Sequence, residues 1–159
     1  MGGAADTHHG TAVALGGLAA LIVGPSGSGK SDLALRCLTL APTELIPEPA
    51  VLIADDRVHI EAVSGRLRVN APETLLGQLE VRGLGIVPVP FRWAADLVLI
   101  AEIAAAGSVE RLPDPPLWRD LLGIGVPVLR ICPFEASAPS KLLLALMQTA
   151  QTQGGGQNS

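Results

Sequence analysis

The stretch that decides the fold is Gly24-Pro25-Ser26-Gly27-Ser28-Gly29-Lys30-Ser31, which fits the pattern G-x-x-x-x-G-K-[ST] at every fixed position. An apolar run precedes it at residues 21–23, and residues 31–40 carry leucines at helical spacing. A strand, a glycine-rich loop and a helix in this order predict a phosphate-binding loop (P-loop), because main-chain N–H groups and a helix N-terminus can surround phosphate oxygens. A glycine-rich turn with a chance Lys-Ser pair is the alternative.

The residue types in this loop indicate how it would hold a nucleotide. Glycines allow the main chain to turn its N–H groups inward. Lys30 is expected to reach the β- and γ-phosphates of a nucleotide, and the Ser31 hydroxyl is expected to bind Mg²⁺.

Apolar runs on both sides of the loop predict the surrounding architecture. Thr11–Leu15 and Leu18–Val23 are separated by Gly16-Gly17, and a second alternating pattern turns at Ser64-Gly65, so both predict hairpins. Further strands are expected at Val51–Ala54, 97–100 and 126–131, and helices at 31–40, 72–79 and 141–150. Strands and helices interleave, which predicts an α/β fold with a mixed sheet and flanking helices.

Composition limits the classes of function. A length of 159 residues fits one P-loop domain, expected over residues 9–149, with a flexible tail at 1–8 and a disordered tail at 150–159. The net charge is −4 with scattered basic residues, so no nucleic-acid partner is expected. No apolar run is long enough to cross a membrane. Two distant cysteines, Cys37 and Cys132, fit a reducing, cytoplasmic setting.

An acidic pair follows the predicted strand Val51–Ala54. Asp55 and Asp56 stand at the carboxyl end of this strand. Carboxylates in such a place beside a P-loop strand can hold Mg²⁺ or accept the proton of a hydroxyl group. The alternative is a turn opener, since Asp favours turns. We interpret the pair as functional because two adjacent acids accompany the phosphate loop.

Four segments together resemble HPr kinase/phosphorylase. They are His9-Gly10, the phosphate loop with residues 31–35 (SDLAL), residues 52–58 (LIADDRV) and residues 79–86 (LEVRGLGI). The last segment is the most specific, because phosphate loops are common and this run beside one is not. The resemblance is to the short type of the family, which consists of the C-terminal domain alone.

The resemblance implies a P-loop kinase domain of the HPr kinase / PEP carboxykinase-like type. It implies a serine kinase that uses ATP and Mg²⁺ to phosphorylate the phosphocarrier protein HPr or a paralogue and so regulates the phosphotransferase system. It also implies the reverse phosphorolysis, and it leaves homo-oligomerisation open.

The resemblance also assigns roles to individual residues. Asp56 would be the base, Asp55 would support it, Lys30 would stabilise the transferred phosphoryl group, and Ser31 and Glu80 would hold Mg²⁺. His9 and Arg111 would lie near the phosphates, and the loop of Arg82, Gly83, Leu84 and Gly85 would meet the protein substrate.

The sequence departs from the family at the turn before the last helix. A Pro-Gly-Arg-Asn segment associated with phosphorolysis is replaced by residues 133–140 (PFEASAPS). The resemblance at this turn therefore does not extend to the segment associated with the reverse phosphorolysis. Two alternatives stay open: a P-loop kinase for a small metabolite, and a nucleotide-sensing module without catalysis.

Overall fold

The sheet is built around its longest strand, β9 (Ala95–Ile103), in a computed structural model that describes residues 4–154. The elements before it are β1 (Ala5–His9), β2 (Thr11–Leu15), β3 (Leu18–Val23), α1 (Lys30–Thr39), β4 (Val51–Ala54), β5 (Arg57–Val63), β6 (Arg66–Asn70), a 3-10 turn (Glu73–Leu75), β7 (Gln78–Val81) and β8 (Gly85–Pro88). After it come β10 (Trp118–Leu121), β11 (Ile124–Ile131) and α2 (Ala138–Gly154).

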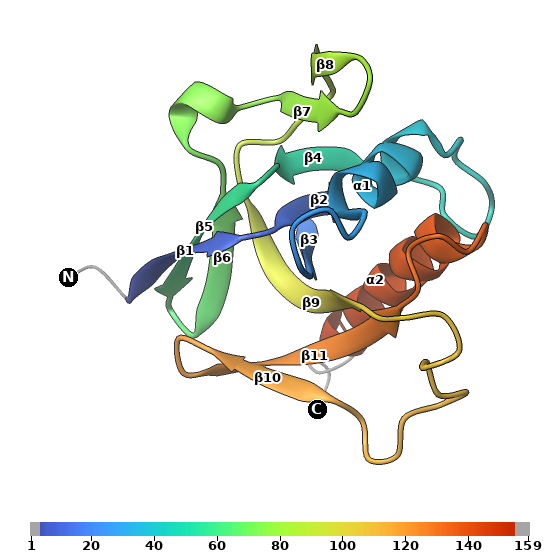
Figure 1. Cartoon of the computed structure of the whole chain (residues 1–159). Helices are drawn as coiled ribbons and strands as arrows, with labels where there is room; N and C mark the ends of the chain where they lie inside the picture. Colours follow the sequence, from blue (N-terminus) through green and yellow to red (C-terminus); the bar gives the residue numbers. More distant parts are fainter. Residues whose placement is uncertain (1–3, 155–159) are drawn as a thin grey trace.

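Nine of these strands form one mixed sheet (Figure 1). The order is β1-β5-β6-β9-β3-β2-β4, and β11 joins β9 and carries β10 at its other side. Strands β3, β9 and β11 are parallel, whereas β2 is antiparallel to both β3 and β4. Strand β4 therefore runs in the same direction as β3, and the carboxyl ends of all four parallel strands lie at one edge. Strands β7 and β8 form a separate hairpin above β4.

The two faces of the sheet bury different cores because side chains alternate along each strand. In β3, Ala20 and Ile22 face the core beneath α1 and α2, whereas Ala19 and Leu21 face a second core. The second core is closed by the sheet itself, since β5 and β6 contribute Ile60 and Val69 to it. The mixed α/β architecture with flanking helices is confirmed.

The two predicted hairpins are confirmed, with the turns that glycine makes possible. Gly16 has φ 57° between β2 and β3, and Ser64 and Gly65 have φ 52° and 76° between β5 and β6. Two successive residues with positive φ give the right-handed twist that two-residue hairpin turns need.

Three segments differ from the sequence-based predictions. The tail predicted at residues 1–8 contains strand β1, which pairs with β5 and gains its order from that partner. The disordered tail predicted from residue 150 is helical as far as Gly154 because α2 continues through it. The helix predicted at 72–79 is only the turn Glu73–Leu75, after which Gln78 begins β7. The remaining tail residues, 1–3 and 155–159, lie outside the described residues.

Neither helix among residues 4–154 combines the length and apolar character needed to cross a bilayer.

Candidate functional site

The phosphate loop lies at the sheet edge where the parallel strands end. It joins β3 to α1, so its main chain passes from the carboxyl end of a strand to the N-terminus of a helix. Gly27 and Gly29 have φ 76° and 101°, in the left-handed region that favours glycine. Gly29 is the residue before α1, and its carbonyl accepts from Leu33 N–H at 2.9 Å. The predicted strand–loop–helix context is therefore present.

Two side chains of the loop point into it. Lys30 Nζ donates to the carbonyl oxygens of Gly24 and Pro25, both at 2.9 Å, so its charge lies against the loop's own main chain. Ser28 Oγ is buried and is the one such side-chain N or O atom without a hydrogen-bond partner in the described part of the chain. Buried hydroxyl groups usually have a partner. An orphaned hydroxyl inside a glycine-rich loop fits an oxyanion ligand such as a nucleotide phosphate.

Asp55 joins the phosphate loop to two other elements. Its Oδ1 accepts from Ser31 Oγ at 2.7 Å and from Thr11 Oγ1 at 2.9 Å, and its Oδ2 accepts from the main-chain N–H of Glu80 at 3.1 Å. The residue is only 8% exposed. Three donors therefore fix a buried carboxylate directly beside the hydroxyl that a P-loop offers to Mg²⁺.

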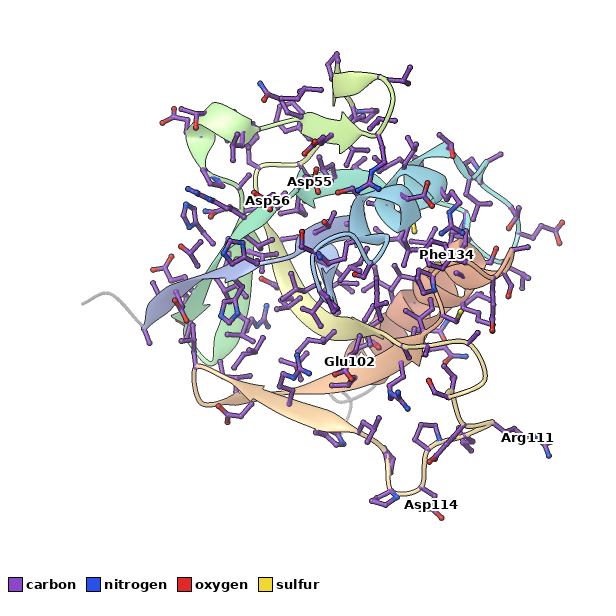
Figure 2. The ribbon with its side chains drawn as sticks, in the orientation of Figure 1. Asp55, Asp56, Glu102, Arg111, Asp114 and Phe134 are labelled. Atoms are coloured by element: carbon purple, nitrogen blue, oxygen red, sulfur yellow. The ribbon has the colours of Figure 1, made fainter. Side chains whose placement is uncertain are left out.

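Asp56 is exposed and follows Asp55 in a strained conformation. Its φ of 68° is unusual for a residue with a side chain, although Asp tolerates it better than most. The turn is held by Gly10 N–H, which donates to Asp56 O at 3.1 Å, and by Arg57 N–H, which donates to Asp55 O at 2.8 Å. Adjacent acids thus have different surroundings: Asp55 is locked into the protein, and Asp56 faces solvent (Figure 2).

Glu80 and His9 lie near the acidic pair on two different elements, β7 and β1. The Glu80 side chain is exposed on β7, while Leu79 beside it is fully buried and packs the hairpin against the core that α1 shares. His9 ends β1 and stands opposite Arg57 in the register with β5, next to the Asp56 turn. The structure thus brings both residues to the neighbourhood of the acidic pair by their main-chain positions.

The tip of the β7–β8 hairpin is exposed. Gly83 and Gly85 have φ 91° and 93°, and Leu84 between them is 78% exposed. This tip presents an apolar side chain on a glycine-flexed turn, in the hairpin whose Glu80 main chain binds Asp55, and such a side chain can contact a second molecule.

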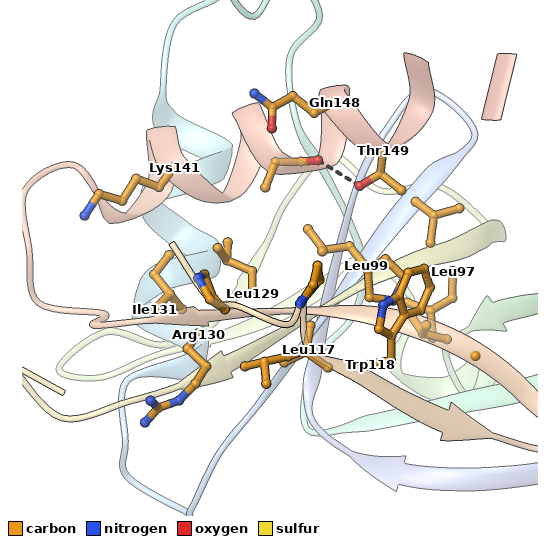
Figure 3. A pocket seen from close by; sticks show the side chains of 18 of the residues that line it. Leu97, Leu99, Leu117, Trp118, Leu129, Arg130, Ile131, Lys141, Gln148 and Thr149 are labelled. Atoms are coloured by element: carbon orange, nitrogen blue, oxygen red, sulfur yellow. Dashed lines mark hydrogen bonds between the residues drawn. The ribbon is translucent and has the colours of Figure 1, made fainter. Parts of the chain in front are cut away.

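Arg111 is not brought to this group. It lies in the exposed segment between β9 and β10, on the opposite side of the molecule from Asp55 and Asp56 (Figure 2). It lines instead an open cavity of about 1540 Å³ between that segment, β11 and α2, whose lining includes no residue of the phosphate loop (Figure 3). The structure thus does not bring Arg111 close to the phosphate loop, where the resemblance implied that it would lie.

Sequence reasoning did not single out Thr11 or Glu102, two polar residues that the structure places near the phosphate loop. Thr11 is buried among apolar residues of β2, and the signal that could have found it is a lone polar residue at a strand start. Glu102 stands at the end of β9 beside Val23, where an acid could serve a P-loop, but it pairs with Arg119 at 2.5 Å and with Arg130 at 3.9 Å.

The residues present fit Mg²⁺ bound together with nucleotide phosphates. Residues 4–154 contain no group of three His, Cys, Asp or Glu side chains that could hold a metal ion alone. Mg²⁺ commonly keeps several waters and takes only one or two protein ligands besides phosphate oxygens. Ser31 Oγ and Asp55 are placed to provide that small set of oxygens.

Comparisons with known proteins show which family this chain resembles. The family model of the HPr Serine kinase C-terminal domain matches residues 3–158. HPr kinase/phosphorylase of Clostridium tetani (strain Massachusetts / E88) is 43% identical over 121 residues, covering 73% of this chain and 35% of the relative. The protein of the same name from Caldicellulosiruptor bescii is 37% identical over 136 residues, covering 79% of this chain and 41% of the relative.

The fold also matches a solved structure. The Hpr(Ser) kinase/phosphatase from Coxiella burnetii aligns with a TM-score of 0.72 and 22% identity, over 94% of this chain and 99% of the other. The chain spans 35–41% of the length of the two curated relatives above. Since the family model matches nearly the whole sequence, this chain belongs to the family of the HPr serine kinase C-terminal domain.

Proposed function

We propose that this chain is a cytoplasmic catalytic domain that transfers the γ-phosphoryl group of ATP to a serine of the phosphocarrier protein HPr or a paralogue. The observation that carries the proposal is the Asp55 carboxylate, which hydrogen-bonds Ser31 of the phosphate loop at 2.7 Å and the Glu80 main chain at 3.1 Å. One buried group thereby positions the nucleotide loop, the Asp56 turn and the exposed β7–β8 hairpin relative to one another.

The proposed role of each residue follows from its surroundings. Lys30 would exchange its contacts with Gly24 and Pro25 for the β- and γ-phosphates, and the loop N–H groups would hold the remaining oxygens. Ser31 and Asp55 would hold Mg²⁺, with Glu80 beside them. When bound, Mg²⁺ supplies charge that offsets the negative charge of the transferring group.

Asp56 is the proposed base. It faces solvent, where a substrate serine can reach it, whereas Asp55 is buried and three donors leave at most one of its four lone-pair sites, which the Mg²⁺ ion would take. Asp56 would accept the hydroxyl proton as the serine oxygen bonds to the γ-phosphorus and the bond from phosphorus to the ADP oxygen breaks. His9 would lie at the edge of this reaction centre, and the hairpin tip around Arg82 and Leu84 would contact HPr.

The test is a transfer assay with the purified chain, labelled ATP, Mg²⁺ and HPr. Label on an HPr serine, lost in Lys30→Ala, supports the proposal. Label only on small molecules of an added metabolite mixture would indicate a metabolite kinase, and tight ATP binding without any transfer would indicate a sensing module. Adding inorganic phosphate to phosphorylated HPr then measures whether pyrophosphate is released, which is the reverse reaction.

A further inference from the structure

The turn between β11 and α2 lies against the phosphate loop. A Cβ atom placed on Gly29 would be 3.3 Å from Cε1 and Cζ of Phe134 and 3.6 Å from Cβ of Pro133. The edge of the Phe134 ring therefore touches the main chain just before Lys30. Even so, Phe134 is 73% exposed, so the greater part of its ring is open to solvent.

The main chain around Phe134 is fixed although its ring is exposed. The Arg36 guanidinium, on α1, donates to the carbonyl oxygens of Pro133 and Glu135 on either side of it. Glu135 in turn pairs with Lys141 of α2 at 2.6 Å, and its carbonyl accepts from Ala138 N–H at 3.0 Å. An exposed aromatic ring on an anchored turn loses little conformational freedom when it stacks on a ligand.

Phe134 and the acidic pair lie on opposite flanks of the phosphate loop. Strand β4, which leads to Asp55 and Asp56, is on one side of β3, whereas β9 and β11, which leads to Phe134, are on the other. Figure 2 shows Asp55 and Asp56 above and to the upper left of the loop that precedes α1, and Phe134 to its right. A phosphate chain that reacts at Asp56 therefore carries its nucleoside end toward the flank of Phe134.

We propose that Phe134 is the platform on which the base of the bound nucleotide stacks. This inference rests on the proposed function for the identity of the ligand as a nucleoside triphosphate. Stacking on an aromatic face recognises any base by its π-surface rather than by hydrogen bonds. Phe134 thus sets affinity for the nucleoside part and is not expected to affect how the loop grips the phosphates.

The test compares the binding of Mg-ATP with that of Mg-tripolyphosphate, which has the phosphate chain and no base. Phe134→Ala should raise the Kd of ATP roughly tenfold and leave that of tripolyphosphate unchanged, because base–aromatic stacking is typically worth that much. Phe134→Tyr should restore ATP binding. Trp118→Ala removes another exposed aromatic side chain, 65% exposed on β10, and should leave both values unchanged.

The outcomes separate this inference from the proposed function. If Phe134→Ala weakens both ligands equally, the ring shapes the loop and the stacking proposal is wrong; if it weakens neither, the base lies elsewhere. Both results leave transfer to HPr intact as a proposal. Conversely, if Phe134→Ala shows the base-specific loss while the unmodified protein transfers no phosphate to HPr, the proposed function is overturned and Phe134 remains the platform.

Discussion

Replacing Thr11 by Val tests whether Asp55 is held by the hydrogen bonds described above. Valine has nearly the shape of threonine but lacks the hydroxyl that donates to Asp55 Oδ1 at 2.9 Å. Thr11 is 1% exposed, so no water can easily replace the lost donor. A hydrogen bond to a charged group contributes about 1.5–3 kcal/mol, and the expected loss of unfolding free energy is therefore about 2 kcal/mol.

The measurement is urea unfolding followed by circular dichroism, with thermal unfolding as a second readout. For a chain of this size the same loss lowers Tm by about 4–8 °C. Thr11→Ser is the matched control, because it keeps the hydroxyl and removes one buried methyl group, at a cost of about 0.8 kcal/mol. The reasoning would be refuted if Thr11→Val were as stable as the unmodified protein, or no less stable than Thr11→Ser.

A double-mutant cycle locates the effect at the carboxylate. If Thr11 acts through Asp55, the destabilisation by Thr11→Val should shrink by about 1 kcal/mol or more when Asp55 is already replaced by Asn, since residues in one hydrogen-bond network are not additive. Fully additive losses would mean that the Thr11 hydroxyl stabilises the protein independently of Asp55.

Three further predictions concern single residues. Asp56→Asn should reduce transfer on the order of 10²-fold with ATP binding retained, because Asn also tolerates the φ of 68° but cannot accept the proton; an equal loss of ATP binding would make Asp56 a metal or structural residue. Gly29→Ala should weaken ATP binding, since Gly29 has a φ of 101° and the new Cβ would meet Phe134 at 3.3 Å. The control Gly65→Ala also has a positive φ but adds its Cβ to open space, so it should lower the unfolding free energy by about 1 kcal/mol and leave ATP binding unchanged. Burial raises the pKa of the Cys37 thiol from 9.0 to about 12. The stability that the protonated thiol contributes is therefore complete below pH 9 and is lost as the pH rises from 9 to 12. In unfolding experiments across that range, Cys37→Ala should remove this part of the pH dependence.

Local patterns predicted the elements whose signals are local. The phosphate loop, the hairpin at Gly16-Gly17 and the strand before Asp55 follow from glycine spacing and apolar runs, and all are present. Strand β1 has no apolar pattern and exists because β5 provides its hydrogen-bond partners, which no local window contains. Residues 72–79 favour a helix by composition, but burial of Leu79 under α1 draws the end of this segment into β7.

The candidate site was predictable in part for the same reason. Ser31 and Asp55 could be paired from their motifs, and the structure places them at hydrogen-bond distance. Thr11 could not be assigned to that group, because its contact with Asp55 spans 44 residues and depends on β2 lying between β3 and β4. Phe134 replaces a family motif, so a motif search registers only a missing segment and not a new aromatic surface.

Strand β1 lies at the end of the sheet, yet it supports the turn that carries the proposed base. Its last residue, His9, pairs with Arg57, and the next main-chain N–H, that of Gly10, donates to Asp56 O at 3.1 Å. Deleting Ala5–His9, or replacing these residues with an affinity tag, would remove the strand that pairs with Arg57 and leads into Gly10, and so would loosen the turn that carries Asp56. Protein engineering should therefore leave this strand intact, even though its five residues look dispensable from their polar composition.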